Sequence, residues 1–381
     1  MQNRVKSKNA IIIIGNGFDK AHNLPTSYGE FADYYLKNVI LERLYNYDKD
    51  DKFFNQHFIA DLRNNPLPIF ERLEKGFNRN EDDDDFEFLK NNPKAITFIL
   101  KNEFLAKLYN DQYNNWFDIE AAYFSELQLA IIQDERYKSK NEILILNNNF
   151  EEIKRYVKEY LINIKEPEND FYIDNFFRYN FLGKEKNYVL NFNYTNTFNT
   201  YKESFERTLN GTQNTPIVNH IHGDLKSDIL FGYGDSTSDG YQSIKDKDID
   251  EYMDHLKTLY YLRKSKYREL INELEIYSDY EVYVFGHSLG RTDKTLLKKV
   301  LEREKCLNIH LFKRQGKNEI EQKKSFDALI KNILRIFDNE DDVRSKVLDF
   351  ESSITFPYNK QPNSHEIEKR ENSLYKSKKT Q

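Results

Sequence analysis

The sequence predicts an α/β protein built on a doubly wound, mostly parallel sheet that carries a large helical insertion. Short apolar runs rich in β-branched and aromatic residues alternate with stretches of helical spacing, and this alternation favours a sheet with helices on both faces. The apolar runs end abruptly in polar or glycine-rich turns. In such sheets ligands bind beyond the carboxyl ends of the strands, so these turns are where we expect the site.

The first strand is predicted at Ala10–Ile14, which is apolar throughout, as a strand covered on both faces would be. The turn that follows it consists of Gly15, Asn16, Gly17, Phe18 and Asp19. Two glycines allow the backbone to approach a phosphate, and free amides at a following helix start would hold its charge. A turn that needs glycine for its conformation alone stays open as the alternative. We assign residues 1–27 to the α/β core.

Residues 28–182 are predicted to form a helical insertion into this core. Aromatic and aliphatic side chains recur there at helical intervals, and polar breaks separate the segments. Because packing residues dominate, we expect the insertion to regulate the protein rather than to carry its chemistry. Trp116 and Glu120 are the exceptions, and Glu120 is expected either at the nucleotide site or at the surface as a capping residue.

The core is predicted to resume over residues 183–350. A strand expected at Tyr188–Phe192 leads into an asparagine-rich turn that contains Asn193 and Thr195. Asparagine supplies both donors and acceptors without charge, which suits the positioning of a ribose or a water molecule. Such turns are also common for purely conformational reasons, so a structural role stays open.

A histidine pair lies at the end of the next predicted strand, residues 216–222. Side chains alternate along a strand, so His220 and His222 are expected on the same face. Three interpretations compete: His222 is a general base, the two imidazoles bind a metal together with Asp224 or His287, or both are structural histidines. We favour the general base.

The fourth motif follows another apolar strand and precedes a helix predicted to begin near Asp293. Its residues Gly286, His287 and Ser288 match the Gly-x-Ser-x-Gly nucleophile elbow of α/β-hydrolases. A hydrolase of that kind needs an acid and then a histidine after the serine, and His310 precedes the acidic candidates. We therefore prefer a phosphate- or ribose-binding turn and keep a serine hydrolase as an alternative.

Composition excludes several classes of protein. Cys306 is the single cysteine, which rules out an intramolecular disulfide and a four-thiolate zinc module and fits a reducing compartment. A formal charge of −6 gives no general reason to bind nucleic acid. No apolar run reaches the roughly 18 residues of a membrane span, and none resembles a signal peptide, so we expect a cytoplasmic protein. Residues 351–381 are polar and aperiodic, which predicts a disordered tail.

Taken together, these motifs resemble the AbiH family of bacteriophage abortive-infection proteins. The resemblance spans residues 11–312 and implies an antiviral role with a phage-derived trigger as partner; self-association stays open. The motifs that carry it, in the family's order, are Ile12–Asp19, Ala21–Tyr28, Trp116–Glu120 with Tyr123, Asn191–Thr195, His220–Gly223 and Gly286–Leu289 with Asp293.

The same order is remotely similar to that of sirtuin-type domains. That likeness implies a sirtuin-like core in which Asn193 and His222 take the central asparagine and the catalytic histidine. Gly15 and Gly17 fall on the first nucleotide loop, and Gly286 and Ser288 fall on the last. Thr195 replaces the acidic residue that grips nicotinamide in sirtuins. Because the zinc module of the deacetylases needs more than one cysteine, the likeness implies cleavage of NAD itself rather than deacetylation.

The predicted function is therefore a phage-defence effector that cleaves NAD at the nicotinamide ribosyl bond. The leaving group is already cationic, so the site must stabilise an oxocarbenium-like centre and position water, with no metal or prosthetic group. Asn193 would orient the ribose and water, and His222 would accept the proton. A non-catalytic nucleotide-binding sensor, a serine hydrolase and a metal-dependent hydrolase are the alternatives. The nucleotide contacts are expected from Gly15, Asn16, Gly17, Phe18, Asp19, Thr195, Gly286, His287, Ser288 and Asp293.

Overall fold

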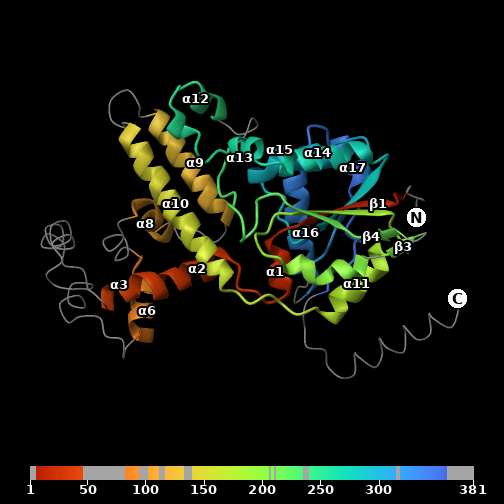
Figure 1. Cartoon of the computed structure of the whole chain (residues 1–381), viewed down its shortest axis with the longest axis horizontal. Coiled ribbons are helices and arrows are strands. Elements are labelled where there is room, and N and C mark those ends of the chain that lie inside the picture. Colours follow the sequence, from red (N-terminus) through yellow and green to blue (C-terminus); the bar gives the residue numbers. More distant parts are fainter. Residues whose placement is uncertain are drawn as a thin grey trace, which may run out of the picture.

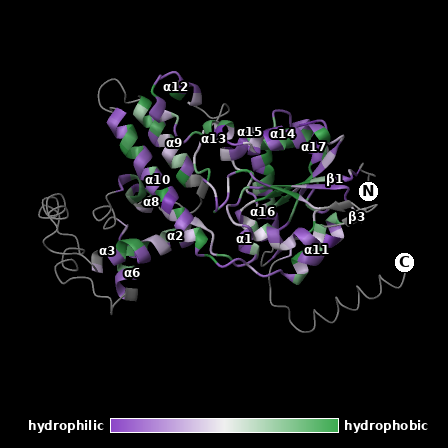
Figure 2. Cartoon of the chain, viewed as in Figure 1, coloured by the Kyte–Doolittle hydropathy of each residue, from purple (hydrophilic) through white to green (hydrophobic). Residues whose placement is uncertain are grey.

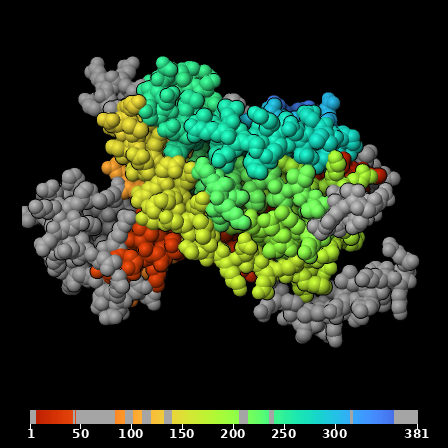
Figure 3. Space-filling view, in the orientation of Figure 1, coloured from red at the N-terminus to blue at the C-terminus, as the bar shows by residue number. Residues whose placement is uncertain are grey.

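The computed structural model describes residues 6–45, 82–93, 102–110, 116–132, 140–205, 207–209, 212–234, 240–314 and 318–357. These residues form an α/β core with a helical lobe beside it (Figure 1). In the space-filling view the yellow helices of the lobe lie directly against green and cyan parts of the core (Figure 3). Among the described residues, no helix combines the length and apolarity needed to cross a bilayer.

A five-stranded sheet forms the core, and every neighbouring pair of its strands is parallel. The α/β class with a parallel sheet, predicted from the apolar runs, is thereby confirmed. A separate antiparallel ribbon pairs β3 (Arg207–Leu209) with β4 (Thr212–Asn214). The five strands of the main sheet are β1 (Asn9–Ile14), β2 (Lys186–Asn191), β5 (Ile217–His220), β6 (Tyr280–Phe285) and β7 (Cys306–Leu311).

The strands lie in the order β5-β2-β1-β6-β7. The chain thus builds outward from β1 through β2 to β5, returns to the other side of β1, and continues through β6 to β7. This is the 3-2-1-4-5 order of dinucleotide-binding α/β folds, in which the ligand crevice lies where the direction of winding reverses. In this protein the reversal falls between the carboxyl ends of β1 and β6.

Both faces of the sheet are covered, which explains why β1 is apolar at consecutive positions. Ile11 and Ile13 face one layer, and Ile12 and Ile14 face the other. Most of the first layer lies above the sheet in Figure 1, and the second lies below it. The helices carry hydrophobic and hydrophilic residues in alternation along each ribbon (Figure 2). The first layer contains α14 (Lys266–Ile276), α15 (Lys294–Leu301), α16 (Glu319–Ile336) and α17 (Glu340–Lys346); the second contains α1 (Asn16–Ala21), α11 (Phe171–Phe181) and the 3-10 segment η3 (Thr197–Phe205).

The helical lobe has an aromatic core of its own. Phe150 stacks on Tyr123 with ring centroids 4.1 Å apart and on Phe231 at 5.1 Å. Phe231 comes from a later part of the chain, so the lobe combines the expected insertion with a segment that follows β5. The lobe comprises α2 (Tyr28–Tyr35), η1 (Leu36–Leu41), α3 (Glu42–Tyr45), α6 (Asp82–Asn91), α8 (Glu103–Asn110), α9 (Trp116–Ile132), α10 (Lys140–Ile162), α12 (Tyr241–Lys245) and η4 (Asp250–Tyr252).

Two segments pack differently from the domain boundaries expected on sequence. Within residues 28–182, α11 joins the core because Ile173, Phe177 and Phe181 recur on one helical face and pack on the sheet. Residues 351–357, expected in the polar tail, also pack against the core. Phe356 is buried there with its ring 5.0 Å from that of Phe285, and its amide donates to the carbonyl of Lys313 at 3.2 Å. The rest of the predicted tail, 358–381, lies outside the described residues.

Candidate functional site

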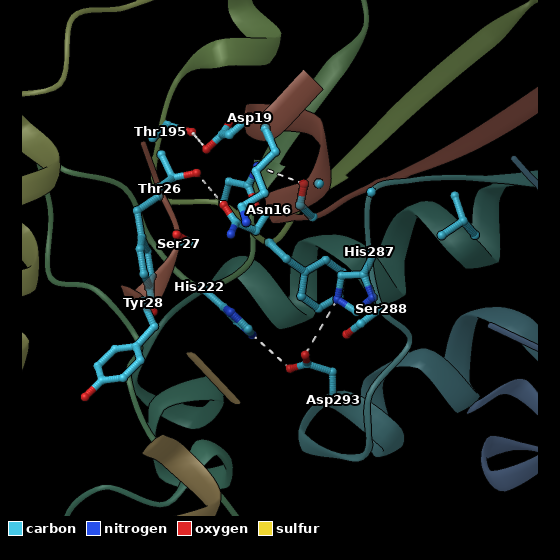
Figure 4. Close-up of a pocket in the computed structure, with 18 of the residues that line it drawn as sticks. Asn16, Asp19, Thr26, Ser27, Tyr28, Thr195, His222, His287, Ser288 and Asp293 are labelled. Carbon is cyan, nitrogen blue, oxygen red and sulfur yellow. Dashed lines mark hydrogen bonds and ion pairs between the residues drawn. The ribbon is translucent and has the colours of Figure 1, made fainter. Parts of the chain in front are cut away.

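A cavity of about 340 Å³ opens at the carboxyl ends of β1, β2 and β6, at the reversal point of the sheet. The turns after these strands form much of its wall, and residues 26–28 close one side (Figure 4). Every site residue expected from the sequence lines this cavity except Phe18. Those that do are Gly15, Asn16, Gly17, Asp19, Asn193, Thr195, His222, Gly286, His287, Ser288 and Asp293.

Phe18 belongs to the core rather than to the cavity. Its side chain is buried on the face of the sheet, with its ring centroid 4.7 Å from that of His22 and 6.0 Å from that of Phe177. The chain enters α1 at Asn16, and the helical turn directs Phe18 toward the sheet while Asp19 faces the cavity. We expected Phe18 to contact the nucleotide; its side chain instead packs in the core.

The glycines of the two turns are explained by the way the turns pack against each other. The amide of Gly17 donates to the carbonyl of Gly286 at 2.9 Å, and that of Gly15 donates to the carbonyl of Phe285 at 3.0 Å. A Cβ on Gly286, whose φ is +68°, would lie 2.2 Å from the amide nitrogen of Phe18. The conformational alternative left open by the sequence therefore accounts for these glycines without a phosphate.

Asp293 is the centre of a buried polar group. Nε2 of His222 lies 3.1 Å from Oδ1 of Asp293, and Nε2 of His287 lies 3.6 Å from Oδ2 (Figure 4). The amide of Leu289 donates to Nδ1 of His287 at 2.9 Å, so a neutral His287 carries its hydrogen on Nε2, facing the carboxylate. We expected Asp293 to bind the nucleotide; its two oxygens instead face the two histidines.

The protonation states follow from burial and charge. Burial lowers the pKa of His222, although the Asp293 carboxylate opposes this effect, so the imidazole is neutral at neutral pH. Burial alone would raise the pKa of Asp293, but Lys257 and His222 outweigh it and hold that pKa well below its usual range. The pair therefore consists of an ionised carboxylate and a neutral histidine, the arrangement in which a carboxylate orients a general base.

Lys257 is a site residue that the sequence analysis missed. It begins α13 (Lys257–Arg263) and is fully buried, with Nζ 2.8 Å from Oδ1 of Asp293 and 3.4 Å from Oε2 of Glu120. Glu120 was expected either at the nucleotide site or at the surface. It is buried and lines the cavity. Burial raises the pKa of Glu120 to about 7, against the opposing effect of Lys257. A lysine inside a helical stretch carries no motif that would single it out.

The asparagine-rich turn after β2 is tied to the turn after β1. Nδ2 of Asn193 donates to the carbonyl of Gly15 at 3.1 Å, and Oγ1 of Thr195 donates to Oδ2 of Asp19 at 2.7 Å. Burial raises the pKa of Asp19 to about 6, although the hydrogen bond from Thr195 opposes this. Across the cavity, Oγ1 of Thr26 donates to Oδ1 of Asn16 at 2.5 Å. These side chains fix the shape of the cavity whatever it binds.

The histidine pair does not share a face. Strand β5 ends at His220, so His222 lies in the turn beyond it, where strand alternation no longer applies. Nδ1 of His220 lies 3.1 Å from the carbonyl oxygen of Asn193, whereas His222 faces Asp293. Within the described ranges, no group of three or more histidine, cysteine or acidic side chains is placed to hold a metal ion.

Three cations line the cavity that the motifs did not identify: Lys20, Lys313 and Arg314. Lys20 lies in α1, and the other two follow β7 directly, at the same edge of the sheet as the motifs. Neither Lys20 nor Arg314 forms an ion pair with a described residue, whereas Nζ of Lys313 lies 4.1 Å from the ring centroid of Phe350. Unpaired cations beside a cavity suit a ligand with phosphate groups.

The turn that contains Ser288 lacks the features of a nucleophile elbow. In an elbow the serine itself occupies the strained position of the turn, but here the left-handed residues are Gly286, with a φ of +68°, and Leu289, with a φ of +56°. Nδ1 of the adjacent His287 is occupied by the Leu289 amide, and no described histidine hydrogen-bonds to Oγ of Ser288. The geometry thus gives the serine-hydrolase alternative no support.

Comparison with known proteins gives one finding. Residues 11–314 match the model of a family described as "Bacteriophage abortive infection AbiH". The match begins within β1 and ends at Arg314, so it includes every lining residue of the cavity except Leu329 and Phe356. A search of curated proteins gave no match to this chain.

Proposed function

The chain belongs to the AbiH family of bacteriophage abortive-infection proteins, and from this premise we propose that it is an effector that cleaves NAD at the nicotinamide ribosyl bond. A role in phage abortive infection follows from the family. The finer proposal rests on one observation, the buried pair of His222 and Asp293 at the reversal point of the sheet. A general base supported by a carboxylate is what the activation of a water molecule requires.

A dinucleotide suits the cavity for two reasons. The strand order is that of dinucleotide-binding folds, and the cavity lies where those folds hold their ligand. Lys20 and Arg314 would neutralise the pyrophosphate from the rim, as guanidinium and ammonium groups do in other phosphate sites. Packing between the two turns explains their glycines. The proposal of a phosphate ligand therefore rests on Lys20 and Arg314.

The reaction needs one proton acceptor. Nε2 of His222 lies 3.1 Å from Oδ1 of Asp293, although the two are not aligned as a hydrogen bond. The adjacent carboxylate favours the tautomer with the hydrogen on Nε2, which leaves Nδ1 as the acceptor. Water attacks C1′ of the ribose, the bond from C1′ to the nicotinamide nitrogen breaks, and nicotinamide leaves as a neutral molecule. The proton lost by the water goes to Nδ1, and Asp293 stabilises the imidazolium that forms. Asn193, whose Nδ2 is held by Gly15, would offer its Oδ1 to the ribose or the water.

The dependence of the reaction on pH follows from the lowered pKa of His222. The base is active when neutral, so the rate should be constant at neutral pH and fall only when the pH drops through the pKa of His222. The acid limb of kcat/KM against pH is therefore expected below about 6.5, the ordinary pKa of histidine. Initial rates measured from about pH 4.5 to about pH 8 would locate this limb. An acid limb at or above neutral pH would contradict a buried, neutral His222 as the base.

Purified protein incubated with NAD tests the proposal itself. We expect nicotinamide and ADP-ribose in equal amounts, detected by chromatography, and no release from a His222→Gln variant that still binds NAD. Binding of NAD in calorimetry without release, in protein taken from infected cells, would instead support a nucleotide-binding sensor that passes its signal to a partner.

Ser288 gives a separate prediction, because it lines the cavity without a base beside it. Ser288→Ala should weaken NAD binding by about 0.5 to 1.5 kcal/mol, the contribution of one hydrogen bond, and leave substantial turnover. Calorimetry and initial rates measure the two effects. A fluorophosphonate probe should leave Ser288 unlabelled; covalent labelling together with complete loss of turnover in the variant would instead establish a serine nucleophile.

A further inference from the structure

A buried chain of charges connects the helical lobe to the base. Glu120 is on α9 in the lobe, Lys257 begins α13, and Asp293 ends the 3-10 turn η5 (Arg291–Asp293) after β6. Nζ of Lys257 bridges the two carboxylates, at 3.4 Å from Glu120 and 2.8 Å from Asp293. The Oδ1 atom that accepts from Lys257 is the same atom that faces Nε2 of His222.

A second link joins Glu120 to His222 through the backbone. Oε1 of Glu120 accepts a hydrogen bond from the amide of Gly232 at 3.1 Å, and the amide of Leu230, two residues earlier, donates to the carbonyl of His222 at 2.7 Å. The hydroxyl of Tyr194 donates to the carbonyl of Leu230 at 2.7 Å and holds this segment in place. Displacement of α9 would therefore act on the His222 side chain and on its backbone together.

The pairing of Lys257 depends on the charge and the position of Glu120. The ionisable groups that face the network are Glu120, Lys257, Asp293, His222 and His287, with Tyr194 at its edge, which remains neutral because burial raises its pKa well above the usual range. While Glu120 is ionised, Lys257 is shared between two carboxylates. When Glu120 is neutral or has moved away, Lys257 pairs with Asp293 alone, and Oδ1 becomes a weaker partner for His222.

We propose that Glu120 and Lys257 are positioning residues through which the helical lobe controls the base His222. This inference rests on the proposed function, because it assigns regulation to the same site. A partner that binds the lobe and shifts α9 would change the protonation and orientation of His222 without entering the cavity. Neither residue contacts the reacting atoms, so their effect should be visible in the titration of His222 itself.

The test is an NMR titration of His222 in protein whose histidines are isotope-labelled. The chain contains eight histidines. Loss of one signal in a His222→Gln sample assigns the resonance. The Glu120→Gln variant mimics the neutral form of Glu120. Lys257 then pairs with Asp293 alone, so Oδ1 of Asp293 stabilises a protonated His222 less and the pKa of His222 should fall. The double variant Glu120→Gln/Lys257→Met removes both charges and leaves the Asp293 carboxylate with only His222 and His287 as partners. In this variant the pKa of His222 should rise above the wild-type value by about one unit.

A matched control comes from a second lysine–glutamate pair, the partly buried Lys184 and the buried Glu281, near the opposite end of the sheet from the cavity. The variant Lys184→Met/Glu281→Gln should lower thermal stability yet leave the His222 titration unchanged. An unchanged His222 titration in the folded Glu120 and Lys257 variants would overturn the inference. If His222 shifts as expected while NAD is never cleaved, even by protein from infected cells, the network stands and the proposed reaction fails.

Discussion

Replacing His222 with alanine should lower the rate of NAD cleavage by about 10² to 10⁴, the usual cost of losing a general base. His287 also lines the cavity and faces Asp293, but its Nδ1 already accepts from the amide of Leu289, so among the described residues it has no free nitrogen with which to replace His222. The fold should survive, because the side chain lies in a turn beyond β5 rather than within the packed core. Single-turnover rates and thermal unfolding measure the two effects.

His220→Gln is the matched control for this change. His220 lies two positions earlier, at the end of β5, and does not line the cavity. Glutamine retains a donor for the carbonyl of Asn193, so turnover should remain within a few-fold of wild type. Equal losses in the two variants would indicate a structural effect of disturbing this turn, and a His222→Ala variant with full turnover would remove the proposed base.

Gly286→Ala should destabilise the protein by about 2 to 5 kcal/mol, the combined cost of a strained backbone conformation and of overpacking. The left-handed φ of +68° disfavours any side chain, and the added Cβ would lie 2.2 Å from the amide nitrogen and 2.4 Å from the carbonyl carbon of adjacent residues in the facing turn. Because both contacts are with backbone, the two turns must separate. Urea unfolding gives the free energy, and loss of NAD binding should accompany it.

Gly29→Ala provides the control for this substitution. Gly29 lies inside α2, and a Cβ there would meet no atom within 4 Å. Alanine should therefore stabilise the protein by up to about 1 kcal/mol through its better helix propensity. Wild-type stability in Gly286→Ala would mean that the turns do not pack as closely as described.

The fold and most of the cavity could be predicted because each depends on local sequence. Consecutive apolar residues such as Ile11 to Ile14 indicate a strand covered on both faces, and the carboxyl ends of parallel strands necessarily share one edge. Motifs that directly follow such strands are brought together whatever separates them in the chain. Lys313 and Arg314 follow β7 in the same way, so the same rule would have found them.

The rest of the site depends on contacts between distant segments. Glu120, Lys257 and Asp293 meet only because α9 packs against η5 across the boundary between lobe and core, and no spacing in the sequence records this. The sequence predicted a nucleotide contact for Phe18 rather than a core position for a related reason. The direction of a side chain in the first turn of α1 depends on how that helix lies on the sheet, and the sequence of the turn does not contain that information.

Cellular NAD during phage infection is the most direct test of the central claim, since infection supplies whatever activates the protein. Cells that express the wild type, His222→Ala or Asn193→Ala at matched levels would be infected, and NAD and survival followed together. Asn193→Ala also removes the hydrogen bond to Gly15, so its thermal stability is measured in parallel. Wild-type cells should lose NAD and block the phage, whereas both variants should keep NAD and lose protection. Protection by the wild type with NAD unchanged, or full protection by both folded variants, would contradict NAD cleavage at this site.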